Sequence, residues 1–190
     1  MNQGKAFIFS APSGAGKTTI VNHLLKKFPN LGFSISATTR EKRPNEVEGK
    51  DYYFLSKRDF EKKILDGEFV EWEQVYQGLY YGTLRKEVER IWNNGKHVVF
   101  DVDVAGGVNL KEYFGSLGLA VFIKVPDINV LRDRLAARNT ETPESMAKRL
   151  EKVEYEMQYE NRFDISLVND NLDKALVEAE SLVTKFLAEK

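Results

Sequence analysis

The feature that most constrains this chain is a glycine-rich decapeptide, residues 10–19, placed between an apolar run and an amphipathic segment. It reads Ser-Ala-Pro-Ser-Gly-Ala-Gly-Lys-Thr-Thr. The apolar residues 6–9 before it are typical of a short buried strand, and residues 20–25 after it carry apolar side chains at helical spacing. Glycines between a strand and a helix let backbone N–H groups turn inward toward an anion. The sequence therefore predicts a strand, a phosphate-binding loop (P-loop) and a helix in direct succession.

The polar side chains of this loop suit a nucleoside triphosphate. Lys17 is expected to reach the outer phosphates, and the Thr18 hydroxyl to bind a Mg²⁺ ion that bridges them. Ala11 replaces a consensus glycine, which is tolerated if φ is negative there. The alternative, a flexible turn with a chance lysine, does not account for the flanking strand and helix. The residues expected to bind the triphosphate are Ser13, Gly14, Ala15, Gly16, Lys17, Thr18 and Thr19.

Length and composition narrow the possible classes of protein. A chain of 190 residues suits one compact core with inserted excursions. The formal net charge of −1 argues against a general nucleic-acid binder, and no apolar run approaches membrane-spanning length. Without cysteine there is no disulfide framework or thiolate metal site, and His23 and His97 are the only histidines. The expected location is the cytoplasm, with no nucleic-acid or membrane partner.

Alternating apolar strands and amphipathic helices predict an α/β fold, a doubly wound parallel sheet in a three-layer core. The strand candidates are residues 6–9, 97–103, 119–125 and 165–168. The helix candidates after the first are residues 83–93, 146–157 and 172–186.

Two outgrowths interrupt this alternation. Residues 33–82 read as a small β-rich insert, with strand-like pieces at 33–36, 52–55 and 69–72. Residues 127–150 read as an arginine-rich helical lid broken at 139–143, with Thr142 as N-cap and Pro143 at the first helical position. The predicted core segments are residues 1–32, 83–126 and 151–190.

The insert carries groups that suit a second phosphate. Arg40 and Arg43 stand three residues apart and match the several acceptor oxygens of a dianionic phosphate monoester. Tyr52 and Tyr81 can each add a neutral donor. A solvated, charged loop is the alternative, and it would be favoured if no phosphate-binding loop stood in the same chain.

An acidic residue in an apolar strand, Glu71, suits a donor-bearing base. A buried carboxylate needs hydrogen-bond donors, and guanine offers N1–H and N2–H₂, while its O6 accepts. A hydroxyl of Ser36 or Thr83 facing O6 would then select guanine over adenine. Taken alone, Glu71 would be interpreted as a surface-facing strand residue.

Asp101 and Asp103 stand near the end of a strand and share one of its faces. An acidic residue there acts on Mg²⁺ directly or through water, so Thr18 and Asp101 are the expected metal residues. Asp103 lies closer to the strand end, where ligands collect in open α/β sheets. The alternative is a cap on a turn at Gly106-Gly107.

Arginines of the predicted lid suit the charge that develops during phosphoryl transfer. Arg134 and Arg138 are four residues apart, and Arg149 lies beyond the break. A lid that closes them over the site would stabilise that charge and exclude water. The alternative is an ordinary charged helix face.

Together these motifs resemble the guanylate kinase family over nearly the whole chain. The segments that support this resemblance are residues 10–19, 34–44, 46–54, 69–72, 80–83, 101–103 and 134–142. The block at 34–54, in register with the P-loop, is the most specific. Ala105 departs from the family, which commonly has glutamine there.

The resemblance implies a P-loop core, a GMP-binding insert and a lid that transfer the γ-phosphoryl group of Mg·ATP to GMP, and to dGMP too. Arg40, Arg43, Tyr52 and Tyr81 would hold the GMP phosphate, and Ser36, Glu71, Thr83 and Asp103 would contact guanine. Lys17, Arg134, Arg138 and Arg149 would stabilise the transferring group, and Asn169 would contact adenine. The alternatives are a kinase for another nucleoside monophosphate, an inactive protein-binding module of the same fold, or a free-standing ATPase or GTPase.

Overall fold

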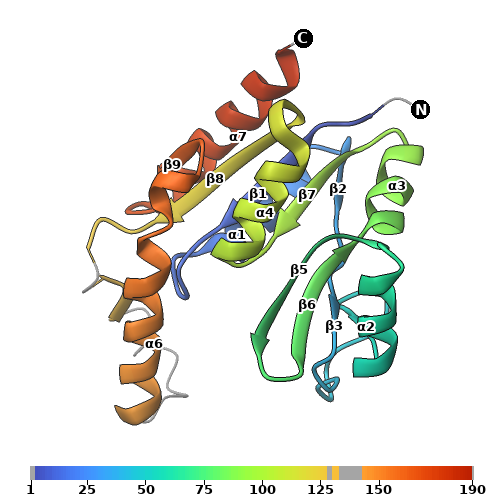
Figure 1. The fold of residues 1–190 in the computed structure, drawn as a ribbon. Coiled ribbons are helices and arrows are strands. Elements are labelled where there is room, and N and C mark those ends of the chain that lie inside the picture. The colour runs from blue at the N-terminus through green and yellow to red at the C-terminus, as the bar shows by residue number, and fades with distance from the viewer. Residues whose placement is uncertain (1–2, 128–129, 133–142, 190) are drawn as a thin grey trace.

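The computed structural model describes residues 3–127, 130–132 and 143–189 and shows a three-layer α/β core (Figure 1). Its five-stranded sheet is parallel throughout, with the order β2-β7-β1-β8-β9. The strands, in that order, are Leu31–Phe33, His97–Asp101, Ala6–Ser10, Gly118–Lys124 and Ile165–Val168. The predicted fold class is therefore confirmed. None of the helices in the described ranges is long and apolar enough to cross a membrane.

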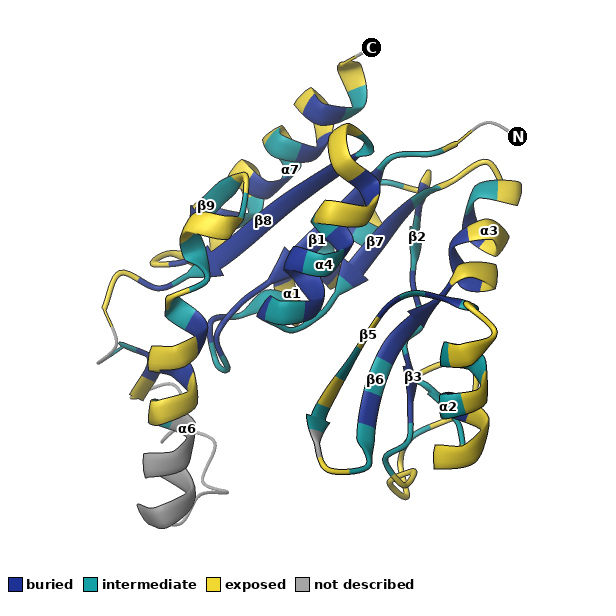
Figure 2. Ribbon diagram, in the orientation of Figure 1, coloured by how far each residue is buried: buried dark blue, intermediate teal, exposed yellow. Residues whose placement is uncertain are grey.

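Helices cover both faces of this sheet, because successive side chains of β1 point to opposite faces and those of residues 6–9 are all apolar. Phe7 and Phe9 pack with α1 and α7, while Ala6 and Ile8 pack with α3 and α4 on the opposite face. Figure 2 shows the resulting pattern, with buried central strands and exposed outer helix surfaces. The helices are α1 Lys17–Lys27, α2 Lys57–Leu65, α3 Arg85–Asn93, α4 Val104–Phe114, α6 Pro143–Met157 and α7 Leu172–Ala188, with 3₁₀ turns at Gly115–Leu117 and Glu160–Arg162.

One strand prediction was wrong in its assignment. Phe33 was expected to begin a strand of the insert, but it ends β2, which pairs with β7 at the edge of the main sheet. The chain leaves that sheet at Ser34, whose amide still donates to the Val99 carbonyl at 2.9 Å. A three-residue strand that contains Gly32 is too short to show periodicity, so no local pattern predicted it.

A second, four-stranded sheet lies below the first and has the order β4-β3-β6-β5. Its strands are Tyr53–Phe54, Ala37–Thr38, Leu79–Leu84 and Phe69–Tyr76. Helix α2, which the sequence analysis did not predict, packs Phe60 against this sheet, with ring centroids 4.4 Å from Phe69 and 5.2 Å from Tyr80. This apolar cluster is separate from the two clusters of the main sheet.

A buried carboxylate on α3, Glu87, connects the two sheets. Its side chain is 1% exposed and accepts hydrogen bonds from the Ile35 amide and the Tyr53 hydroxyl, both at 3.0 Å. Arg90 donates to it at 2.8 and 2.9 Å. Burial acts to raise the pKa of Glu87, but these hydrogen bonds outweigh it and hold the pKa below its ordinary value. The ionised group therefore fixes the segment on which the second sheet begins.

Replacing Glu87 by alanine should lower the free energy of unfolding by about 2–4 kcal/mol, because the Ile35 amide and the Tyr53 hydroxyl lose their acceptor. Urea denaturation measures this change. Glu89→Ala is the matched control, and we expect a loss of about 0.5 kcal/mol or less, since Glu89 is exposed on the same helix. Equal losses for the two variants would contradict the connecting role of Glu87.

Candidate functional site

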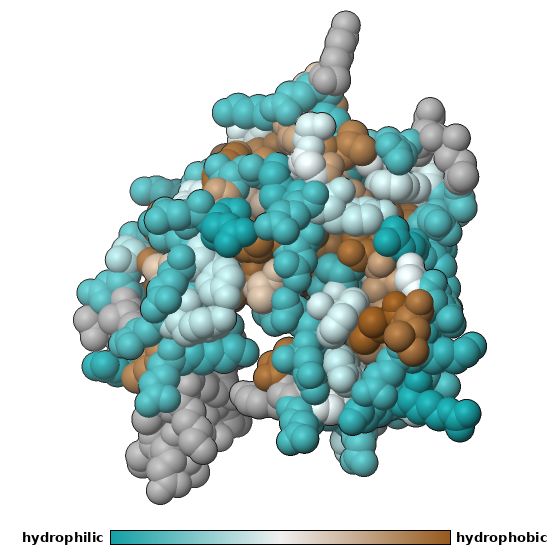
Figure 3. All heavy atoms as spheres, viewed as in Figure 1, coloured by the Kyte–Doolittle hydropathy of each residue, from teal (hydrophilic) through white to brown (hydrophobic). Residues whose placement is uncertain are grey.

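An open cleft lies between the main sheet, the second sheet and α6 (Figure 3). It contains a cavity of about 350 Å³ over the P-loop and an adjoining cavity of about 360 Å³ that faces the second sheet. Lys17, Asp103 and Lys152 line both cavities. The carboxyl ends of parallel strands form the floor, where open α/β sheets bind ligands. Two ligands bound here would meet near these three side chains.

The P-loop has the backbone that its glycines predict. Gly14 and Gly16 have φ of 91° and 92°, and α1 begins at the next residue, Lys17. A Cβ on Gly16 would lie 2.4 Å from Nδ2 of Asn169, which donates to the Ala15 carbonyl at 2.8 Å. Only glycine fits position 16 for both reasons. Of the predicted loop residues, those that line the cavity are Ser13, Gly14, Gly16, Lys17, Thr18 and Thr19.

Two predicted residues of the loop region occupy structural positions. Ala15 is fully buried in the main apolar cluster, so only its backbone faces the loop. Asn169 follows the end of β9, is 3% exposed, and supports the P-loop through the Ala15 carbonyl. This support was not foreseen from the sequence.

Lys17, Thr18 and Asp101 form a compact polar group at the start of α1. Nζ of Lys17 lies 2.5 Å from Oδ1 of Asp101 and donates to the Val102 carbonyl at 2.5 Å. The Thr18 hydroxyl donates to the other oxygen of Asp101 at 3.0 Å. The two residues predicted to bind Mg²⁺ therefore lie side by side, with hard oxygen ligands of the kind that this ion prefers.

Glu71 lies in the floor of the second cavity. It faces Thr83 on the neighbouring strand, and the Thr83 hydroxyl donates to it at 2.8 Å. The side chain is 8% exposed, and desolvation raises its pKa to about 8, opposed by the Thr83 hydrogen bond and reinforced by the charge of Asp103. A buried carboxylate with one side-chain donor can accept more hydrogen bonds from a ligand.

The ionisation of Glu71 should make the protein less stable as the pH rises. Its folded-state pKa of about 8 lies above the ordinary 4.5, so the folded state holds this proton more tightly. The stabilisation is complete below the ordinary value and is lost as the pH rises through about 8. Relative to Glu71→Gln, wild-type protein should therefore lose stability between about pH 5 and pH 9, measured by urea denaturation at each pH. Parallel stability curves for the two proteins would contradict this assignment.

The cavity that contains Glu71 is also lined by Ser36, Tyr52 and Tyr81. The sequence predicts that these residues contact different parts of one ligand, and their common cavity is compatible with that prediction. The rings of Tyr52 and Tyr81 are 6.0 Å apart, and the Arg40 guanidinium lies 5.3 Å from the Tyr52 ring. Arg40 itself does not line this cavity. Its guanidinium donates two hydrogen bonds, of 2.6 and 3.0 Å, to the carboxylate of Glu46.

Glu46 organises the loop that carries the two predicted phosphate-binding arginines. Besides its two contacts with Arg40, it accepts the backbone amide of Arg43 at 2.8 Å. The hydrogen bond with Glu46 raises the pKa of Arg40, so this guanidinium is always charged. The Arg43 side chain is exposed. A carboxylate three residues after Arg43 was a readable signal for this partner, but the sequence analysis did not use it.

Asp103 has a structural contact as well as a place in the cleft. It is the N-cap of α4, and its Oδ1 accepts the Gly106 amide at 2.8 Å. The alternative interpretation of Asp103, a cap on a turn at Gly106-Gly107, is therefore right about the cap, but the two glycines belong to the start of α4 and not to a separate turn. Their function is close packing: a Cβ on Gly107 would lie 2.4 Å from Oγ of Ser10, and one on Gly106 would lie 3.3 Å from Oε2 of Glu71.

The predicted lid falls partly on residues that the structure does not describe. Arg134, Arg138 and Thr142 lie outside the described residues, and Arg149 lies on α6 with its side chain outside them. Pro143 is the first residue of α6, as predicted, and the helix continues through residue 150 to Met157.

The sequence analysis missed two residues on the part of α6 nearest the P-loop. Glu156 is 5% exposed and accepts the Ser13 amide at 3.3 Å, and Nζ of Lys152 lies 3.6 Å from its other oxygen. Burial raises the pKa of Glu156, opposed by the positive charge of Lys152. Their spacing of four residues was the available signal, since it places both on one face of a helix.

Comparisons with known proteins agree with this geometry. The family model described as "Guanylate kinase" matches residues 3–186. The guanylate kinase of Bacteroides fragilis is 48% identical over 185 residues, which are 97% of this chain and 91% of the relative. That of Porphyromonas gingivalis is 46% identical, covering 97% of this chain and 98% of the relative. The crystal structure of guanylate kinase from Anaplasma phagocytophilum superposes with a TM-score of 0.77 at 25% identity, covering 100% of this chain and 89% of that one.

Proposed function

The chain belongs to the guanylate kinase family, and from this premise we propose how its cleft performs the reaction. The enzyme transfers the γ-phosphoryl group of ATP to GMP, giving ADP and GDP by direct in-line transfer. The observation that carries the proposal is the pair of adjoining cavities, one over a P-loop and one ending at a buried carboxylate, which share Lys17. ATP binds in the first cavity and GMP in the second, so the two phosphate ends meet at Lys17.

The second cavity suits guanine at one end and a phosphate at the other. Glu71 loses its proton to solvent when guanine binds, because the N1–H and N2–H₂ donors stabilise the carboxylate that accepts them. The hydroxyls of Ser36 and Thr83 with the carboxylate of Asp103 complete the base site. The phosphate lies toward the tyrosine pair. The residues proposed to hold it are Arg40, Arg43, Tyr52 and Tyr81.

Chemistry in this site is positioning and charge neutralisation. An oxygen of the GMP phosphate is already an anion, so it attacks the γ-phosphorus without a general base. The new P–O bond forms as the bond between the γ-phosphorus and the bridging oxygen of ADP breaks, and ADP leaves with that electron pair. Lys17 stays near the outer phosphates throughout, and the proposed lid cations Arg134, Arg138 and Arg149 close over the transferring group and exclude water. Asn169 is proposed to stand near the adenine of ATP.

Mg²⁺ is the proposed cofactor, and the residues present fit it. The hydroxyl of Thr18 and the carboxylate of Asp101 are 3.0 Å apart beside the P-loop, and both are hard oxygen ligands. They would hold the ion directly or through water. The bound ion neutralises charge on the triphosphate.

For the roles of the segments along the chain we propose the division that the sequence predicts. We propose a core of residues 1–32, 83–126 and 151–190, a GMP-binding insert at 33–82 and a lid at 127–150 that move relative to one another during turnover. The cytoplasmic location and the absence of nucleic-acid and membrane partners stay predictions.

The experiment that tests the function is a coupled ADP-release assay with Mg·ATP and, in parallel, GMP, dGMP, AMP, UMP and dTMP. We expect turnover with GMP, and with dGMP too. Turnover with a different monophosphate would identify a kinase for that substrate instead. Protein that binds GMP but releases no ADP would identify an inactive binding module.

A further inference from the structure

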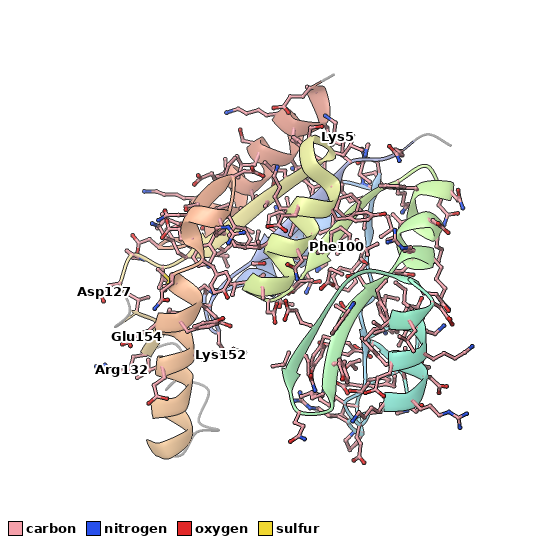
Figure 4. All side chains as sticks on the ribbon, in the orientation of Figure 1. Lys5, Phe100, Asp127, Arg132, Lys152 and Glu154 are labelled. Carbon is pink, nitrogen blue, oxygen red and sulfur yellow. The ribbon has the colours of Figure 1, made fainter. Side chains whose placement is uncertain are left out.

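We propose that Lys152 is a second lysine of the phosphoryl-transfer site, which contacts the phosphates at the junction of the two nucleotides. This inference rests on the proposed function. Lys152 belongs to α6 and lies on the side of the helix that faces the cleft (Figure 4).

Position is the first support. Lys152 lines the P-loop cavity together with Ser13, Lys17 and Thr18, and it also lines the cavity that contains Glu71. It further lines a third cavity of about 560 Å³ between α6, α4 and β5. Lys152 therefore stands at the boundary of the first two cavities, where the phosphate ends of two bound ligands would meet.

Charge is the second support. Among the described residues that line the three cavities, Lys17 and Lys152 are the basic ones. The acidic ones are Glu71, Glu73, Asp101, Asp103, Glu151 and Glu156. Two nucleotides add further negative charge, and Lys17 already has close contacts with Asp101 and the Val102 carbonyl. A second cation therefore lowers the repulsion at the point where the phosphates approach one another.

Glu156 is the residue that positions Lys152. The two are four residues apart on α6, and the 3.6 Å ion pair directs the lysine toward the P-loop, where Glu156 also accepts the Ser13 amide. The Lys152 side chain is 52% exposed. Its flexible stem and compact ammonium group can therefore reorient toward a phosphate while the buried Glu156 stays in place.

Lys152→Met tests the inference, because methionine keeps the apolar stem and removes the charge. We expect kcat to fall about 10- to 100-fold, as for loss of one preorganised donor to a developing charge. Lys152→Arg should recover most of this loss. The KM for GMP and the thermal midpoint should stay close to wild type, which separates a contact made in the transition state from a structural effect.

The matched control is Lys62→Met. Lys62 is an exposed lysine of α2 that lines none of the three cavities. It should leave kcat unchanged. A kcat for Lys152→Met within twofold of wild type, or a change only in the KM for ATP, would overturn the inference and leave the proposed function standing. Wild-type protein without GMP-dependent ADP release would overturn both.

Discussion

Lys17→Met should lower kcat by about a thousandfold or more while the protein stays folded, because it removes the cation nearest the transferring group. Lys17 is the basic residue that lines both the P-loop cavity and the cavity of Glu71 and also contacts Asp101. The ADP-release assay with saturating GMP measures the effect. Stability should change little, since Asp101 keeps its hydrogen bond from Thr18.

Lys26→Met is the control for this prediction, because Lys26 is exposed on the same helix and does not line the cleft. It should retain wild-type kcat. Circular dichroism and a thermal midpoint close to wild type would show that Lys17→Met is folded. A folded Lys17→Met protein with full activity would falsify the assignment of the P-loop.

Glu71→Gln should lower kcat/KM for GMP by about 100-fold or more, because the amide that replaces one carboxylate oxygen is a donor facing guanine donors. The change keeps the shape of the side chain, and Thr83 can still donate to the remaining carbonyl oxygen. The KM for ATP should not change. Stability above about pH 8 should rise, since the variant has no buried charge to desolvate.

Glu73→Gln provides the matched comparison for Glu71→Gln. Glu73 stands two residues further along the same strand and lines the same cavity, but its Oε1 accepts from Asn109 at 2.9 Å. We expect it to change the use of GMP much less than Glu71→Gln does. If Glu71→Gln kept the wild-type preference for GMP over AMP, the role of Glu71 in base recognition would be refuted.

Elements with strong local patterns were predictable from the sequence. The P-loop is marked by its glycines, and β1 by a continuous run of apolar residues. Both signals can be recognised from a few consecutive residues of the sequence. Helix α2 was missed although Ser56 accepts the Asp59 amide at its start, because the helix has nine residues, of which Phe60 is the buried one, and it lies in a stretch that we interpreted as β-rich. Strand β2 is defined by pairing with β7, which no local pattern reports.

The site was predictable where residue type fixes the chemistry, and not where contacts between distant segments fix it. Glu71 was singled out because a buried carboxylate needs hydrogen-bond donors, and Asp101 because it stands near the carboxyl end of a core strand beside a P-loop. The contacts of Glu156 with the Ser13 amide and of Asn169 with the Ala15 carbonyl span 143 and 154 residues, so only the folded chain reveals them. Lys152 belongs to the same group, since its position follows from the placement of α6.

The separate apolar cluster beneath the second sheet has a consequence for how damage to this protein would spread. Phe60, Phe69 and Tyr80 pack in a cluster separate from the two apolar clusters of the main sheet, so the two sheets can differ in local stability. Loss of packing in this cluster would disturb the cavity that contains Glu71, which β5 and β6 line, more than the cavity over the P-loop, which belongs to the main sheet.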